Sequence, residues 1–204
     1  IDKIKPIVSS EIIGGEGYSD TSGGWYKDDV RLKVTATDEA SGVGTLTCNN
    51  DTSVNEEKSK IYVKEYGPFK TGINTFEYFA TDVAGNDSEV GTTDIKVDMI
   101  KPVVARFTKL TNDWVNSETG VIFECEGQDE ESGLLQFVLE RSENGKDEWI
   151  DGTTYSFLGE NTLEKVNIVV KQNGYYRLAV YDRVLNIAYA SDVIYVDNID
   201  DNPP

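Results

Sequence analysis

The stretch VRLKVTATDEASG, residues 30–42, alternates apolar and polar side chains and then ends in residues typical of turns. Val30, Leu32, Val34 and Ala36 share one phase, and charged or hydroxyl residues take the other. Successive side chains of a strand point to opposite faces. The pattern therefore predicts a strand with one buried face, followed by a tight turn.

The same pattern occurs a second time, as VIFECEGQDEESG at residues 121–133. Its surroundings recur as well: IDKIKPIV at 1–8 returns as VDMIKPVV at 97–104, and NTFEYFATDVAGN at 74–86 as GYYRLAVYDRVLN at 174–186. Self-similarity at a spacing of about 100 residues indicates two copies of one module cut from a longer array.

The repeat sets the expected fold class and domain organisation. Each copy contains five to seven short alternating segments with turn signals between them, and no convincing helix. We expect an all-β protein of two tandem immunoglobulin-like antiparallel β-sandwiches joined by a short linker. The modules should occupy 1–98 and 99–197, and 198–204 should begin a linker to a further module.

Composition excludes several classes of function. The formal net charge is −18 and the pI is about 4.3, so nucleic acid and anionic membranes would be repelled. The sequence has no histidine, which removes Ser-His-Asp and Cys-His catalysis and nearly all zinc chemistry. It has no run of 18 apolar residues that would insert in a membrane. We therefore expect no enzyme activity.

The repeat alignment also predicts the surroundings of single residues. Cys125 aligns with Val34 and Cys48 with Leu139, so each cysteine is expected in the core of its own module, without a disulfide. Trp114 aligns with Trp25, and this recurrence favours a packing role for both tryptophans.

The turn in YDRVLN at 181–186 departs from its counterpart in TDVAGN at 81–86. Leu185 replaces Gly85 there, and glycine is the usual residue of a tight turn. We expect the two turns to differ in shape.

These motifs resemble those of bacterial Ig-like repeats from large Gram-positive surface and secreted proteins. The resemblance rests on Asp-x-Ile-x-Pro at 2–6 and 98–102, GWYKDDV at 24–30, DEASG at 38–42 and TDVAGN at 81–86. It covers nearly the whole chain. It implies an extracellular protein, at the cell surface or secreted, in which such repeats act as stalks, spacers or adhesive modules.

The first functional hypothesis is a non-enzymatic stalk or spacer, with adhesion as a further role and neighbouring Ig-like modules of the same chain as partners. The alternatives are a module that recognises a host protein or glycan through the second copy, and an accessory region of a secreted hydrolase. One fold hosts many functions, so the resemblance does not name a ligand.

Six aspartates define a candidate metal site. In an Ig-like sandwich, the strands ending at Asp38 and Asp82 should approach the incoming chain at the same pole. Carboxylates that converge in this way favour calcium as a cofactor. The alternative is that each aspartate only caps its own turn. The six residues are Asp2, Asp38, Asp82, Asp98, Asp129 and Asp182.

Three aromatic residues define a candidate ligand surface. Trp149, Tyr155 and Phe157 lie in a part of the second copy that is longer than its counterpart in the first. Differences between repeats tend to mark the face with a specific role. Aromatic side chains there would stack on sugars or anchor a protein. The alternative is that they cap the end of the core.

Overall fold

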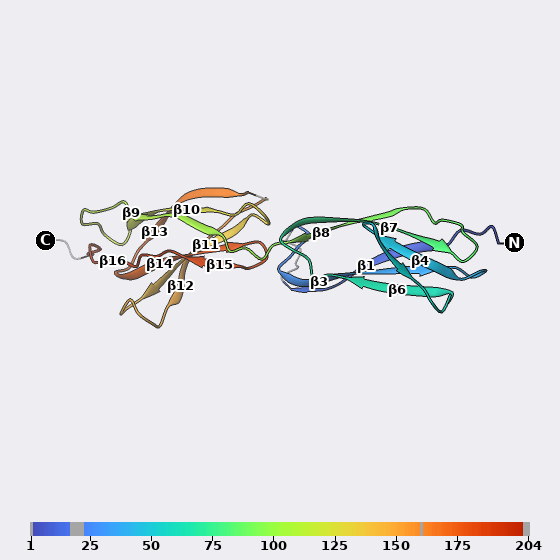
Figure 1. Ribbon diagram of the computed structural model, residues 1–204. Coiled ribbons are helices and arrows are strands. Elements are labelled where there is room, and N and C mark those ends of the chain that lie inside the picture. Colours follow the sequence, from blue (N-terminus) through green and yellow to red (C-terminus); the bar gives the residue numbers. More distant parts are fainter. Residues whose placement is uncertain (1, 17–22, 160, 202–204) are drawn as a thin grey trace. The chain divides into compact units, whose positions relative to one another are not determined.

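The computed structural model describes residues 2–16, 23–159 and 161–201, and these residues form strands and loops without a helix (Figure 1). Contacts divide the chain into two compact units, and the division falls between Asp98 and Met99. Each unit pairs a three-stranded sheet with a five-stranded one around a hydrophobic core of its own. The predicted all-β architecture of tandem β-sandwiches is confirmed.

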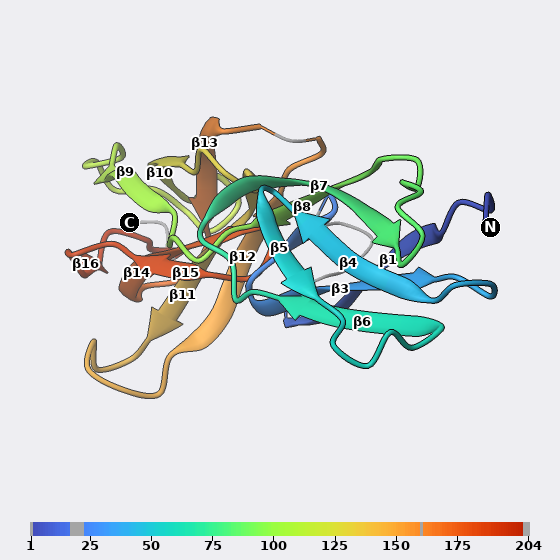
Figure 2. The same ribbon diagram turned by 45° about the vertical axis from the view of Figure 1, so that its right-hand side comes forward.

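Unit 1 is built from the first eight strands of the structure (Figure 2). Its smaller sheet has the order β1-β3-β6 and its larger sheet the order β2-β8-β7-β4-β5. Pairing is antiparallel except between β2 and β8, which run parallel. The strands are β1 (Ile7–Glu16), β2 (Trp25–Tyr26), β3 (Asp28–Thr37), β4 (Val43–Cys48), β5 (Asp51–Val54), β6 (Ile61–Tyr66), β7 (Gly72–Asp82) and β8 (Gly91–Val97).

Unit 2 repeats this plan with β9 and the strands that follow it. Its smaller sheet has the order β13-β10-β9, and its larger sheet the order β12-β11-β14-β15, with β16 also paired to β14. The strands are β9 (Val103–Lys109), β10 (Val121–Gln128), β11 (Leu134–Ser142), β12 (Ile150–Ser156), β13 (Leu163–Val170), β14 (Gly174–Asp182), β15 (Ile187–Tyr189) and β16 (Ile194–Val196).

The alternating strands supply both cores as predicted. Val30, Leu32, Val34 and Ala36 of β3 are all buried, and β10 buries its corresponding residues. Each core belongs to one unit alone. The apolar phase of one strand in each smaller sheet thus meets the larger sheet and joins the two layers.

Both cysteines lie where the alignment places them. Cys48 is buried in the core of unit 1 and Cys125 in the core of unit 2, and both are free thiols. Burial raises the pKa of Cys125 to about 12. Each cysteine therefore acts as a small apolar side chain, as predicted.

The two tryptophans do not play the same role. Trp25 is buried, and its backbone pairs with Lys96 of β8. In unit 2 the corresponding parallel bridge is made by Val115, with Ile199, and Val115 packs on the core. Side chains alternate along an extended chain, so Trp114 points outward and is 71% exposed. The prediction of a packing role for Trp114 was wrong.

Residues 198–201 pack on unit 2, whereas the sequence assigned 198–204 to a linker. Asn173 donates its side-chain amide to the carbonyl of Ile199, and Ser117 donates its N–H to Asp201. The buried Asn198 accepts a hydrogen bond from Lys109. These contacts extend the unit beyond β16, which corrects the assignment; residues 202–204 lie outside the described part of the chain.

The chain enters each sandwich at one end and leaves it at the other. In unit 1, Ile7 at the start of β1 pairs with Thr37 at the end of β3, whereas Val97 at the end of β8 pairs with Gly72 at the start of β7. In unit 2 the same positions are taken by Val103 with Gln128 and by Val196 with Gly174. We call these ends the entry pole and the exit pole of each unit.

Candidate metal centre at the entry pole

Asp82 ends β7 at the entry pole of unit 1 and caps the turn that follows. One carboxylate oxygen accepts the N–H of Asn86 at 2.8 Å, and the other accepts the side-chain amide of Asn86 at 2.6 Å. Burial by itself would raise the pKa of the Asp82 carboxyl. The hydrogen bonds from Asn86 and the other turn amides have the larger combined effect, so the pKa lies below its usual value. Asp82 is therefore ionised at neutral pH.

The turn after β14 has the same hydrogen bonds, although its sequence differs. Asn186 donates its N–H to Asp182 at 2.7 Å and its side-chain amide at 2.7 Å. Leu185 has a φ of 66°, in the same left-handed region as Gly85 with a φ of 91°. The expectation that the two turns differ in shape was wrong, because Leu185 adopts the conformation that glycine adopts more easily.

Asp38 follows β3 and uses only one of its two carboxylate oxygens for the turn. Its Oδ1 accepts the N–H of Gly42 at 2.7 Å and the hydroxyl of Ser41 at 3.4 Å. Its Oδ2 is fully buried and has no hydrogen-bond partner in the described part of the chain. Asp38 itself is 3% exposed.

Asp2 precedes β1 and brings the incoming chain to the same pole. It accepts the N–H of Ile4 at 2.9 Å and the N–H of Ser41 at 3.1 Å. The Ile4 hydrogen bond is the main reason that the pKa of Asp2 is lowered. The side-chain amide of Asn86 also reaches the carbonyls of Asp2 and Ile4, at 3.4 Å each.

Asp2, Asp38 and Asp82 converge, as the sequence predicted for this pole. One carboxylate oxygen from each lies within 4.8 Å of the other two. The hydrogen bonds above also establish turn capping by Asp38 and Asp82, whereas Asp2 accepts the N–H of Ser41 from the turn after β3. The two interpretations of the sequence are thus compatible, because a carboxylate has several acceptor positions.

The three aspartates predicted as the second group, Asp98, Asp129 and Asp182, belong to different units. Asp129 and Asp182 lie at the entry pole of unit 2, where Asp129 accepts the N–H of Gly133 at 2.8 Å. Asn186 reaches the carbonyl of Ile100 in the incoming chain at 3.0 Å. Asp98 is the last residue of unit 1, and its N–H bonds to the carbonyl of Tyr26.

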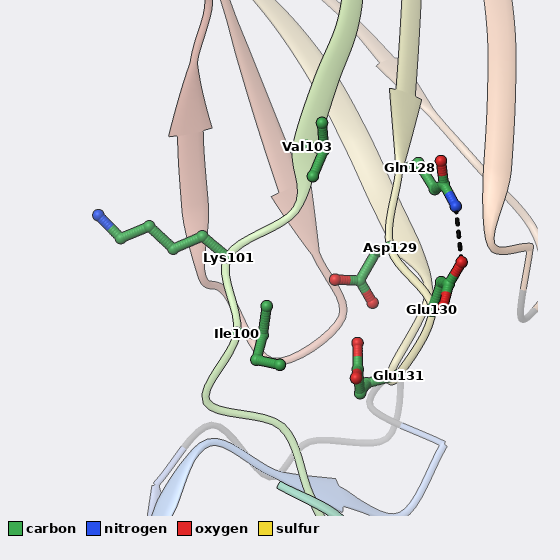
Figure 3. Close-up of a pocket in the computed structure, with 7 residues that line it drawn as sticks. All are labelled: Ile100, Lys101, Val103, Gln128, Asp129, Glu130 and Glu131. Atoms are coloured by element: carbon green, nitrogen blue, oxygen red, sulfur yellow. Dashed lines mark hydrogen bonds between the residues drawn. The ribbon is translucent and has the colours of Figure 1, made fainter.

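A pocket opens beside Asp129 at the entry pole of unit 2 (Figure 3). The carboxylates of Asp129 and Glu131 face one another across it, whereas Lys101 extends away. Glu130 is held at the rim by a hydrogen bond from Gln128 of 2.8 Å. The pocket is lined by Ile100, Lys101, Val103, Gln128, Asp129, Glu130 and Glu131, so acidic groups dominate its polar surface.

The three predicted aromatic ligand residues do not form one surface. Phe157 is buried against Phe137, with the ring centroids 4.8 Å apart in an edge-to-face arrangement. Tyr155 covers Phe157 and is half-exposed. Trp149 instead lies against Arg177, whose side chain is on the outward phase of β14. The alternative interpretation, in which these aromatic residues cap the end of the core, therefore holds for Phe157.

The sequence did not reveal a cluster centred on Arg177. Its guanidinium lies 4.4 Å from the ring centroids of both Trp149 and Tyr189. It also pairs with the buried Glu140, at 2.5 Å between Nη2 and Oε2. The signal present in the sequence was the outward phase of β14, where Arg177 alternates with the buried Tyr176 and Leu178.

Comparisons with known proteins give structural likenesses at low sequence identity. No known protein-family profile and no curated protein sequence matches the chain. Among solved structures, the D00-D0 domain of intimin is similar at 11% identity and a TM-score of 0.42, covering 94% of this chain and all of that one. Fibronectin(III)-like modules of Clostridium thermocellum CbhA are similar at 14% identity and a TM-score of 0.38, over 93% of this chain and 94% of theirs.

The protein is thus of the class of tandem Ig-like β-sandwiches, as its own sheets and cores establish. A glucan-utilisation protein of Bacteroides ovatus, SGBP-B, is a third similar structure, at 13% identity and a TM-score of 0.24 over 96% of this chain and 61% of that one. At these values the likenesses carry no inference about activity. Within the described residues, no helix is long and apolar enough to cross a membrane.

Proposed function

We propose that the chain is a non-enzymatic pair of Ig-like spacer modules from a Gram-positive surface or secreted protein. The observation that carries the proposal is the path of the chain, which enters each unit at one pole and leaves it at the other. A module of this kind adds its own length to an array, because its neighbours attach at opposite ends. Its partners are then the adjoining modules of the same chain.

The dimensions suit this role. The strands β1 and β7 contain 10 and 11 residues. At about 3.3 Å per residue such strands are roughly 35 Å long, so a module extends an array by on the order of 40 Å. Unit 1 extends to Asp98, and Met99 belongs to unit 2. The high negative charge suits an exposed, crowded surface because it opposes association.

Single-molecule force spectroscopy tests the spacer proposal. We expect the full chain, pulled from its termini, to give two separate unfolding events that recover after relaxation. Each event should release on the order of 300 Å, because about 100 residues extend at 3.3–3.6 Å each. A chain that extends gradually at low force, without these events, would contradict a spacer that carries load.

Antibody labelling of intact cells of the source organism tests the proposed location at the surface.

The Arg177 cluster favours a second candidate, recognition of a host protein or glycan by unit 2. Trp149, Arg177 and Tyr189 present stacked aromatic and cationic groups on an outward sheet face. Aromatic and arginine side chains are common at the centres of binding surfaces. An array of glycans and host proteins tests this candidate, with Trp149→Ala expected to abolish any binding. Trp114→Ala is the matched control, because Trp114 is exposed elsewhere on unit 2.

Adhesion and an accessory role in a secreted hydrolase are variants of these two candidates. Both use the same modules, in the first case through the surface at Arg177 and in the second through the spacing of other domains. The sequences flanking this chain in its gene separate them, because a catalytic domain beside the repeats would favour the accessory role.

A further inference from the structure

We propose that Asp2, Asp38 and Asp82 bind a calcium ion at the entry pole of unit 1. The inference goes beyond the spacer function, and it stands on the geometry of this pole alone. The three carboxylates come from the segment before β1, the end of β3 and the end of β7, which are far apart in sequence. One oxygen of each lies within 4.8 Å of the other two.

The unpartnered oxygen of Asp38 is the observation that points to a ligand. Its Oδ1 is occupied by the N–H of Gly42 and the hydroxyl of Ser41, whereas its Oδ2 is buried with no hydrogen-bond partner in the described residues. A buried carboxylate oxygen without a partner is strongly unfavourable, and a buried charge is normally paired or bound to a metal. A cation among the three carboxylates supplies the missing partner.

Repulsion among the three carboxylates points the same way. Ion pairs within residues 2–16, 23–159 and 161–201 do not involve Asp2, Asp38 or Asp82. Lys5 follows Asp2 by three residues, and the carbonyl of Lys60 accepts the N–H of Asp38, but the two ammonium groups pair instead with Glu89 and Glu39. The negative charge of the pole is therefore not balanced by these side chains, and a bound divalent cation would balance it.

The ligand chemistry selects calcium. All three groups are hard oxygen donors, and calcium takes six to eight oxygens at about 2.3–2.6 Å in an adaptable geometry. Two oxygens on opposite sides of such an ion lie about 4.6–5.2 Å apart, so three oxygens that all lie within 4.8 Å of one another can share one ion. The carbonyls of Asp2 and Ile4 lie beside Asn86 at the same pole, and water completes the shell.

A bound ion would also fix the entrance of the chain. Asp2 lies ahead of β1, while Asp38 and Asp82 are anchored by the turns that follow β3 and β7. Coordination by all three ties the incoming segment to both sheets of the sandwich, because β3 and β7 belong to different sheets. The cation thus stiffens the point at which load enters unit 1.

Nuclear magnetic resonance of the nitrogen-15-labelled full chain locates the site. Titration with CaCl2 should shift the amide signals of Ile4, Ser41, Gly42 and Asn86, because their N–H groups donate to the three carboxylates. A parallel titration with MgCl2 should give weaker shifts. The absence of saturable calcium-induced shifts at these four amides would overturn the proposal, whatever happens in unit 2.

Asp38→Asn separates a metal ligand from a turn cap. The asparagine keeps an oxygen for the Gly42 N–H but removes the charge, and its amide donates where Oδ2 had no partner. In EDTA the variant should melt at or above the wild-type Tm, whereas in CaCl2 it should melt below it and lack the calcium-induced shifts. An equal loss of Tm in both buffers would mean that Asp38 only caps its turn.

Glu39→Gln is the matched control for this variant. Glu39 is the next residue, its side chain is exposed, and its substitution changes the net charge by the same amount. It should keep both the calcium-induced rise in Tm and the amide shifts. Loss of the calcium response in Glu39→Gln as well would assign the effect to the overall charge rather than to the site. Force spectroscopy of the calcium-free chain, carried out in EDTA, tests the spacer function without the metal site. The spacer function and the metal site can therefore fail separately.

Discussion

Leu185 lies in a backbone conformation that its side chain disfavours. Its φ of 66° is left-handed, and its exposed side chain covers little of the core. A non-glycine residue in this region costs about 1–2 kcal/mol. The N–H groups of Val184 and Asn186 donate to the Asp182 carboxylate, and these hydrogen bonds hold the turn in place despite this cost.

Leu185→Asn should therefore stabilise unit 2, because asparagine tolerates the left-handed region better than leucine. We expect the free energy of unfolding to rise by about 1 kcal/mol. Chemical denaturation of the full chain, monitored by signals from unit 2, measures the change. Leu158→Asn removes a leucine that is 92% exposed and serves as the control for the loss of an exposed apolar group. A loss of stability in Leu185→Asn would contradict backbone strain at this turn.

At the scale of strands, the small sheet of unit 2 carries a row of charges on its outward face. Glu124 of β10 lies between Lys165 of β13, at 2.6 Å, and Arg106 of β9, at 3.2 Å. The hydrogen bond from Lys165 is the main reason that the pKa of Glu124 is lowered from its usual 4.5. Three strands are thus linked across their outer face by one carboxylate.

Glu124→Gln should flatten the dependence of the stability of unit 2 on pH. A carboxyl whose pKa is lowered on folding stabilises the native state above its unfolded pKa, and this contribution is lost as the pH falls through the folded pKa. The Tm of the wild type should therefore exceed that of the variant at pH 7, and the difference should shrink below pH 4.5. Melting curves at a series of pH values measure it. Glu118→Gln, an exposed residue, should show no such change.

At the scale of the whole molecule, each of the two units has a hydrophobic core of its own. Leu32 lies in the core of unit 1 and Leu178 in that of unit 2, and neither core includes residues of the other unit. Mutations at distant sites with no shared neighbours act independently. Damage to one unit should therefore stay within it.

Leu32→Ala and Leu178→Ala test this independence. Each should destabilise its own unit by about 2–5 kcal/mol, because a buried leucine is replaced by a cavity. Hydrogen exchange read by mass spectrometry should show faster exchange in the strands of the mutated unit only. Faster exchange in both units after either substitution would indicate a single cooperative structure instead.

The candidate metal site shows how far sequence reasoning extends. The recurrence of Asp38 and Asp82 after alternating strands was enough to predict that they meet Asp2, because the strand order of a sandwich brings those ends together. The unpartnered Oδ2 of Asp38 was not predictable, since it depends on which oxygen the Gly42 N–H occupies. The prediction for Trp114 was wrong for a similar reason. The bridge between Val115 and Ile199 decides that the side chain of Val115, rather than that of Trp114, faces the core.

The sequence by itself determined the fold class, the repeat, the buried phase of β3 and β10 and the place of both cysteines. These features follow from local periodicity, because a strand that alternates apolar and polar residues can bury only one face. Only the tertiary structure decided the conformation of Leu185, the outward Trp114, the packing of 198–201 and the Arg177 cluster. The last three depend on pairing between segments distant in sequence, and the conformation of Leu185 depends on the hydrogen bonds that close its turn. The alternation of apolar and polar residues contains neither kind of information.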